Sequence, residues 1–217
     1  MDGKTRVCCI KVSYDKEVYR NLYDLTTHEE KLYLNRYRNE NNRYDSLLGL
    51  IAVKVLAKVS LLQSLCHTTN GQPYLKGYNG RISIAHSNGW VITSVSSYKI
   101  GVDIEKKLYS MDKELFLSKK ELTAFRGKWN TDILTVIWTL KEAYTKSQGV
   151  GFFTDPTNIT CQLEDGYWKI DDCAMHTQTQ ILPDNMTLSV VSESKEVDIR
   201  VISEERLLQQ LNILMYD

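Results

Sequence analysis

Residues 137–152 read Ile-Trp-Thr-Leu-Lys-Glu-Ala-Tyr-Thr-Lys-Ser-Gln-Gly-Val-Gly-Phe, which is typical of a helix that runs into a glycine-rich loop. Trp138, Glu142 and Lys146 are four residues apart, so they share one stripe of that helix. A Glu and a Lys one turn apart commonly form an ordinary surface ion pair. If acidic side chains from elsewhere in the chain lie next to this stripe, Glu142 and Lys146 could instead belong to a functional site.

Composition limits the classes of protein to consider. The chain has 217 residues, of which 42% are hydrophobic and 25% charged, as in ordinary globular proteins. Lys+Arg and Asp+Glu balance at 27 each, so the chain lacks the basic excess of non-specific nucleic-acid binders. No secretory signal and no apolar run of about 18 residues is present. The five cysteines include no Cys-x-x-Cys pair, which disfavours a disulfide framework and a cysteine zinc site. We expect a cytoplasmic protein with no membrane or nucleic-acid partner.

Local patterns predict a mixture of helices and strands. An Asn88-Gly89 turn between two β-like runs in residues 81–95 predicts a hairpin. Thr26 or Thr27 can cap a helix whose first turn holds Glu29 and Glu30. Further strands are expected over residues 6–12, 99–104, 158–163, 167–170, 178–182 and 186–192, and helices over 45–60, 115–125, 133–147 and 204–214.

A short pattern occurs twice. A β-like run beginning at Asn88 leads to Val-Asp-Ile-Glu ending at Glu105, and a run beginning at Asn185 leads to Val-Asp-Ile-Arg ending at Arg200. A true repeat would predict two similar α/β halves packed face to face. Four-residue matches also arise by chance, so the pattern alone leaves both interpretations open. If the repeat is real, its second copy has Arg200 where the first has Glu105, so the pair of acidic residues occurs in the first copy only.

That acidic pair consists of Asp103 and Glu105, on either side of Ile104. On an extended chain the two carboxylates point to one side and Ile104 to the other. Two carboxylates held close together repel each other unless a cation or a proton lies between them. Mg²⁺ suits such a pair, because it prefers oxygen ligands and often bridges carboxylates to substrate phosphates. The alternative is a pair of solvated acids at the end of a strand.

Glu142 would be the third carboxylate of such a site, and Lys146, one turn further on, could reach the same phosphates. Gly149 and Gly151 would allow a ligand to approach the backbone, although a helix C-cap explains Gly149 equally well. His86 is isolated in sequence, and an isolated histidine is more often structural. The absence of a P-loop and of Gly-x-Gly-x-x-Gly after a strand disfavours nucleotide hydrolysis and dinucleotide binding. The residues alone leave open both a Mg²⁺-dependent enzyme that handles phosphate groups and a set of solvated surface charges.

The order of the motifs adds a family resemblance. The matching segments are His86-Ser87, Trp90, Gly101-Val-Asp-Ile-Glu105, Phe116-Leu-Ser-Lys-Lys-Glu121, and Trp138-Thr-Leu-Lys-Glu-Ala-Tyr-Thr-Lys146 with Gly149-Val-Gly151. Together they resemble the 4′-phosphopantetheinyl transferase superfamily, and the length resembles its monomeric, surfactin-synthetase-activating type. Specific motifs cover roughly residues 36–152.

The resemblance implies an α+β fold with a pseudo-two-fold repeat, in which residues 1–104 and 105–217 form two similar halves with cofactor and metal between them. It implies Mg²⁺-dependent transfer of 4′-phosphopantetheine from coenzyme A to a serine of an apo acyl or peptidyl carrier protein. Adenosine 3′,5′-bisphosphate would be released. Secondary-metabolite biosynthesis is the expected setting. The alternative is a non-catalytic relative that binds coenzyme A or a carrier protein.

Site residues follow from the same resemblance. Asp103, Glu105 and Glu142 would hold the metal, and Glu142 would take the serine proton directly or through a metal-bound water. Lys146 would neutralise or protonate the leaving bisphosphate, and His86 would contact a phosphate of coenzyme A. The other expected contacts with coenzyme A are Arg43, Gln72, Pro73, Ser87, Asp103 and Lys146.

Three positions depart from the family pattern at the nucleotide end of the site. Asp45 stands where members often have Arg, Gln72 where they often have Lys, and Ala85 where they often have Ser. We expect weaker binding of coenzyme A or a rearranged 3′-phosphate pocket. Candidate substitutes for the altered contacts are Arg43, Lys76 and Arg81.

Overall fold

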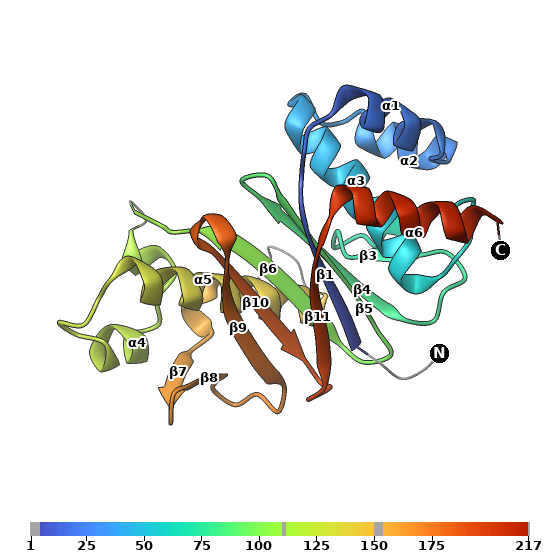
Figure 1. Ribbon diagram of the computed structural model, residues 1–217. Coiled ribbons are helices and arrows are strands. Elements are labelled where there is room, and N and C mark those ends of the chain that lie inside the picture. Colours follow the sequence, from blue (N-terminus) through green and yellow to red (C-terminus); the bar gives the residue numbers. More distant parts are fainter. Residues whose placement is uncertain (1–4, 110–111, 150–153, 217) are drawn as a thin grey trace.

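The computed structural model describes residues 5–109, 112–149 and 154–216, which form an α+β fold with two main sheets (Figure 1). The first sheet has the order β11-β1-β5-β4. Its strands are β1 (Thr5–Lys11), β4 (Arg81–Ser87), β5 (Trp90–Ser96) and β11 (Val197–Ser203). All neighbours in it are antiparallel except β1 and β11, which run parallel.

The second sheet has the order β6-β10-β9, with antiparallel neighbours throughout. Its strands are β6 (Ile100–Lys106), β9 (His176–Leu182) and β10 (Met186–Ser192). The helix α5 (Thr131–Gln148) packs on this sheet, and its Thr139 hydroxyl lies 2.7 Å from the Ser189 hydroxyl of β10. The first sheet carries α3 (Glu40–Ala57) and α6 (Glu204–Tyr216), which lie next to each other in Figure 1.

Short elements complete each part of the chain. The helices are α1 (Lys16–Asp24), α2 (His28–Leu34) and α4 (Lys119–Ala124), and the small hairpins pair β2 (Leu65–His67) with β3 (Pro73–Leu75) and β7 (Cys161–Glu164) with β8 (Tyr167–Ile170). Within the described part of the chain, no helix combines the length and the apolar character needed to cross a bilayer.

Most expected elements are present, with some corrected boundaries. The helix expected over 45–60 begins earlier, at Glu40, because the Asn39 side chain caps it by accepting from the Asn42 N–H. The helix expected over 115–125 is a 3₁₀ turn (Lys113–Leu115) followed by α4, whose N-cap is Ser118. The pattern gave no indication of α1, which Asp15 caps.

A buried ion pair ties α2 to α3. Thr27 and Glu30 form a capping box at the start of α2. The Glu30 carboxylate also binds the fully buried Lys54 ammonium of α3 at 2.8 Å and accepts from the Leu65 N–H at the start of β2. Glu30 therefore fixes a short helix, a long helix and a hairpin with one side chain.

The same arrangement occurs between α4 and α5. Ser118 and Glu121 form the capping box, Glu121 binds the buried Lys141 ammonium of α5 at 2.6 Å, and Glu121 accepts from the Cys161 N–H at the start of β7. The two sets of contacts join equivalent elements in equivalent order: short helix, long helix, small hairpin.

Candidate functional site

The strand β6 separates its side chains between two environments. Val102 and Ile104 are buried in one hydrophobic cluster with β10 and β1 residues. Asp103 interacts on the other side with Lys146 of α5. Gly101 faces the same helix, because a Cβ built on it would meet the backbone of Ala143. The expected alternation around Ile104 is therefore present.

Gly101 sets the distance between α5 and β6. A Cβ at this position would lie 1.8 Å from the Ala143 carbonyl oxygen and 2.6 Å from the Ser147 nitrogen. Both are backbone atoms, so no side-chain movement could relieve the clash. Only glycine allows the helix to lie this close to the strand, and the closeness brings Lys146 within reach of Asp103.

Asp103 lies at the centre of the site. Its side chain is buried, and its Oδ1 accepts from the Lys146 ammonium at 2.6 Å. Its Oδ2 is buried without a hydrogen-bond partner among the described residues. Burial raises the pKa of the Asp103 carboxyl, and the charge and hydrogen bond of Lys146 oppose that rise. Lys146 thus neutralises the charge at Asp103 Oδ1, whereas Oδ2 has no hydrogen-bond partner among the described residues.

Glu105 and Glu142 complete a group of three carboxylates. Glu105 accepts a hydrogen bond of 2.7 Å from the Ser87 hydroxyl. Burial raises the pKa of Glu105, and the charges of Asp103 and Glu142 raise it further. The pKa of Glu142 is raised by burial and then by Asp103. The carboxylates therefore lie close enough to repel one another, and added positive charge would stabilise them.

The donor chemistry of this group suits Mg²⁺. All three side chains offer hard oxygen ligands, and Asp103 Oδ2 has a vacant lone pair in a buried position. Among the described residues, however, no three His, Cys, Asp or Glu side chains already form a group able to hold a metal ion. The Lys146 ammonium lies 2.6 Å from Asp103 Oδ1 and supplies positive charge there.

His86 and Asp45 extend the site toward α3. The His86 Nδ1 lies 3.7 Å from Asp45 Oδ2. Burial raises the pKa of Asp45 to about 6, and a hydrogen bond from Tyr14 opposes the rise. Burial and the nearby charge of Lys146 lower the pKa of His86. At neutral pH His86 is therefore uncharged. It lies next to Asp45, which stands at the position where family members often have Arg.

A cavity of about 210 Å³ opens next to His86. Tyr33, Ser46 and His67 line it, and the His67 ring stacks on Tyr33 with centroids 4.3 Å apart. The Ser46 hydroxyl is buried and has no hydrogen-bond partner among the described residues. Burial lowers the pKa of His67, and the positive charge of Arg36 lowers it further.

Sequence reasoning missed Tyr33, Ser46, His67 and Arg36. They come from α2, the turn after it, α3 and β2, and only the fold brings them together. The i, i+4 spacing of Tyr33 and Tyr37, which also lines the cavity, was the available signal.

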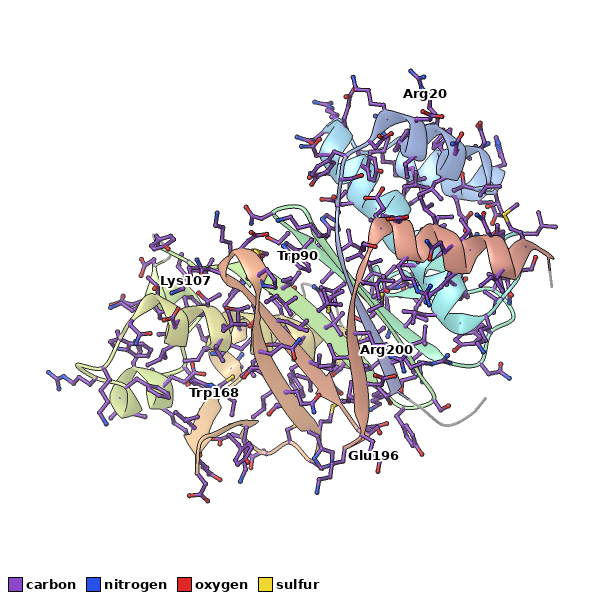
Figure 2. All side chains as sticks on the ribbon, in the orientation of Figure 1. Arg20, Trp90, Lys107, Trp168, Glu196 and Arg200 are labelled. Atoms are coloured by element: carbon purple, nitrogen blue, oxygen red, sulfur yellow. The ribbon has the colours of Figure 1, made fainter. Side chains whose placement is uncertain are left out.

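The other residues predicted to contact coenzyme A do not all lie near His86. Pro73 lines the same cavity as His86, and Gln72 lies so close to Gly149 that a Cβ there would meet its Oε1 at 2.3 Å. Arg43 instead donates to the Tyr37 carbonyl at 2.6 Å and lines a separate cavity with Arg20, which Figure 2 places on the outer side of α1.

The candidate substitutes Lys76 and Arg81 also lie elsewhere. Lys76 lines another surface hollow, and Arg81 is at the opposite end of β4 from His86. The expected approach of Gly151 to a ligand concerns a residue outside the described part of the chain. Trp138, expected to pack α5 on the sheet, meets the Phe116 ring edge-on at 5.6 Å.

Comparisons with known proteins agree with the motifs. The family model described as the 4′-phosphopantetheinyl transferase superfamily matches residues 99–181, which include β6, α5 and β9 except its last residue. The chain is also similar to several curated proteins named 4′-phosphopantetheinyl transferases. The protein named gsp from Aneurinibacillus migulanus is 29% identical over 150 residues, which cover 64% of this chain and 62% of that protein.

Two relatives from Bacillus subtilis align over more of their length. The protein named ffp is 28% identical over 205 residues, 86% of this chain and 92% of the relative. The protein named Sfp, from strain 168, is 27% identical over 191 residues, 80% of this chain and 85% of the relative. The expected enzyme class, a phosphopantetheinyl transferase, agrees with all three names. As its ordered motifs predicted, the chain is similar to members of the 4′-phosphopantetheinyl transferase superfamily.

Proposed function

We propose that the protein transfers the 4′-phosphopantetheine arm of coenzyme A to a serine of an apo acyl or peptidyl carrier protein, in a Mg²⁺-dependent reaction. The serine oxygen forms a bond to the phosphorus next to the pantetheine arm, and the bond from that phosphorus to the bridging oxygen breaks. Adenosine 3′,5′-bisphosphate leaves. The observation that carries the proposal is the convergence of Asp103, Glu105 and Glu142 with Lys146 where α5 lies closest to β6.

Asp103, Glu105 and Glu142 are the residues that would hold the metal. Asp103 Oδ2 is the carboxylate oxygen that Lys146 leaves without a partner, and Ser87 orients Glu105 from the neighbouring strand β4. When bound, Mg²⁺ would screen the negative charge of the pyrophosphate and polarise the phosphorus under attack.

Glu142 and Lys146 would move protons and charge. A carboxylate whose pKa is raised holds a proton more readily at neutral pH, so Glu142 is suited to accept the proton of the serine hydroxyl. The Lys146 ammonium lies one helical turn away and would neutralise or protonate the leaving oxygen. Glu142 is thereby the general base of the proposed reaction and Lys146 the partner of the leaving group.

The cavity next to His86 would take the nucleotide end of coenzyme A. Tyr33 and His67 offer ring surfaces for a base, and Ser46 offers a hydroxyl to an oxygen of the ligand. The positive charge of Arg36 acts on His67, which lines this cavity, and lowers the pKa of that histidine. We assign the phosphate contact expected of Arg43 to Arg36, because Arg43 lines a different cavity.

We also propose that residues 1–104 and 105–217 are two halves related by a pseudo-two-fold axis, with the site between them. The repeated ion pairs of Glu30 with Lys54 and of Glu121 with Lys141 support this division. The boundary falls within β6, which contributes to both halves. Ser87 comes from the first half and Glu142 from the second, so one chain completes the site and the protein can act as a monomer.

The carrier protein is proposed to dock close to the start of α4. Leu115 is 70% exposed there, beside the partly buried Leu122. An exposed leucine next to a hydrophobic cluster offers apolar area to a helix of a partner.

The decisive experiment incubates the protein with coenzyme A, Mg²⁺ and an apo carrier protein, and weighs the carrier by mass spectrometry. A gain of one phosphopantetheine group is expected, and Glu142→Gln or Asp103→Ala should abolish it. Glu164→Gln, on the exposed β7–β8 hairpin, is the matched control. Binding of coenzyme A with no mass gain on several carriers would favour the non-catalytic alternative.

A further inference from the structure

A large cavity lies away from the carboxylate site. It has a volume of about 760 Å³ and is bounded by α3, β1, β11 and α6, which lie together in Figure 1. Figure 2 shows Arg200 on β11, well apart from Lys107, which follows β6. A volume of this size is typical of pockets that hold small ligands.

This cavity occupies the place in the first half that the carboxylate site occupies in the second. In the first sheet Cys8 of β1 pairs with Thr93 of β5, and in the second Asp103 of β6 pairs with Ser189 of β10. Thr93 is the fourth residue of β5, and Ser189 is the fourth residue of β10. By strand pairing Cys8 corresponds to Asp103, whereas in the sequence repeat Asp198 corresponds to it, and both Cys8 and Asp198 line this cavity.

The long helices give the same correspondence. α3 ends at a C-cap with a left-handed backbone at Lys58, and α5 ends at one at Gly149. Val55 and Lys146 each precede their cap by three residues, so Val55 is the counterpart of Lys146. Val55 also lines the cavity.

The chemistry of the cavity is opposite to that of the carboxylate site. Burial raises the pKa of the Cys8 thiol to about 12, although Arg200 opposes the rise, so the thiol is uncharged. The lining includes the cations Arg6, Lys58 and Arg200, and Asp198 as its acid. Asp198 already binds Arg200 at 2.7 Å. Because Asp198 is paired with Arg200, the Lys58 ammonium adds positive charge to this cavity, and that charge favours an anion.

The remaining walls are apolar. Val55 and Leu56 come from α3, and Ile213 and Leu214 come from α6. Ile213 is 62% exposed, so this apolar surface continues to the mouth of the cavity. No aromatic ring stands among the described lining residues to stack a nucleotide base. The combination favours a ligand with one anionic end and an aliphatic chain.

Lys58 supports this assignment independently. Its φ of 53° is in the left-handed region, where glycine is the favoured residue and where Gly149 stands in the counterpart. Among the described residues Lys58 has no ion-pair partner close enough to be a salt bridge. A lysine held in a disfavoured conformation at the mouth of a cationic cavity indicates a role for its side chain.

We propose that this cavity binds a long-chain carboxylate, such as a fatty acid. The carboxylate would lie near Lys58 and Arg200, and the chain would lie along Val55, Leu56 and Ile213. The cavity is separate from the proposed transfer reaction, so its ligand neither requires coenzyme A nor competes with it.

The test titrates dodecanoate, below its micelle concentration, into the full chain by isothermal calorimetry. One site per chain is expected, with no heat from dodecyltrimethylammonium. Lys58→Gln and Arg200→Gln should each weaken binding by about tenfold, the effect of one lost charge-assisted contact. Ile213→Asp should weaken it at least as much, and Lys169→Gln on β8 should leave it unchanged. Thermal melts establish that each variant is folded.

Three results would overturn the proposal. One is equal affinity of the wild type, Lys58→Gln and Arg200→Gln. Another is binding to anionic phospholipid vesicles without binding of free dodecanoate, which would indicate a membrane-facing surface. The third is displacement of dodecanoate by coenzyme A, which would place the ligand in the carboxylate site. Each outcome is independent of whether the protein transfers phosphopantetheine.

Discussion

Replacing Gly101 with alanine tests whether the closeness of α5 to β6 builds the site. The new Cβ would lie 1.8 Å from the Ala143 carbonyl oxygen, so the helix must retreat by about 1.2 Å to reach 3.0 Å, below which real Cβ atoms are essentially never found. Overpacking of this kind typically lowers the free energy of unfolding by about 1–3 kcal/mol, and occasionally by more. The contact of 2.6 Å between Lys146 and Asp103 would be lost or lengthened.

The effect on catalysis should exceed the effect on folding. A misplacement of about 1 Å can reduce a rate by about 10²-fold. We therefore expect kcat/KM for transfer to a carrier protein to fall by about 100-fold at a temperature where urea titration shows the variant to be folded. Circular dichroism should show unchanged helix content, because the clash moves α5 without removing its hydrogen bonds.

Gly49→Ala is the matched control. Gly49 lies in α3, the long helix on the first sheet, and its added Cβ would approach the Ile84 Cγ2 at 2.9 Å. That atom is the end of a side chain and can move, so activity should stay within about twofold of wild type. The explanation would be refuted if Gly101→Ala kept wild-type activity and stability, since α5 would then not depend on this glycine for its position.

Three further substitutions test single contacts. Lys141→Met should lower the free energy of unfolding by about 3–5 kcal/mol because Glu121 stays buried without its partner; a loss under 1 kcal/mol in urea titrations would contradict this. Lys58→Gly should raise that free energy by about 0.5–1 kcal/mol, since glycine adopts the left-handed conformation without strain, and an unchanged urea midpoint would argue against strain there. The pKa of Asp45 is about 6 in the folded protein, above its ordinary value of 3.8. Protonation of Asp45 therefore stabilises the fold below about pH 4, and that stabilisation is lost as pH rises through 6. Asp45→Asn should remove this loss, of up to about 3 kcal/mol, and parallel stability curves for variant and wild type from pH 4 to 8 would disprove the assignment.

The sequence predicted the elements that local chemistry determines. The Asn88-Gly89 turn joins β4 and β5 as expected, with a positive φ at both residues. The strands expected over 167–170 and 186–192 have the same boundaries in the structure. The alternation around Ile104 placed Asp103 opposite the apolar core, because a strand has a side-chain period of two.

The features that local chemistry does not determine were missed or misplaced. Nothing near Gly101 in sequence indicates that the backbone of Ala143 lies against it. The resemblance named Arg43 as a contact for coenzyme A, but Arg43 donates to the Tyr37 carbonyl and lines a different cavity from His86. Tyr33 and His67 are 34 positions apart and meet only because α2 and β2 pack on α3.

The parallel pairing of β1 with β11 places the earliest strand of the chain beside its latest one. Thr5 pairs with Val197 and Lys11 with Ser203, so β1 has one open edge until residues 197–203 have been synthesised. An open strand edge can pair with another chain, and such pairing is a common cause of aggregation. A ribosome-bound or truncated chain that ends before Val197 would therefore expose this edge for the whole of its lifetime. Completion of the first sheet must follow synthesis of β11, whereas the second sheet needs no strand beyond Ser192.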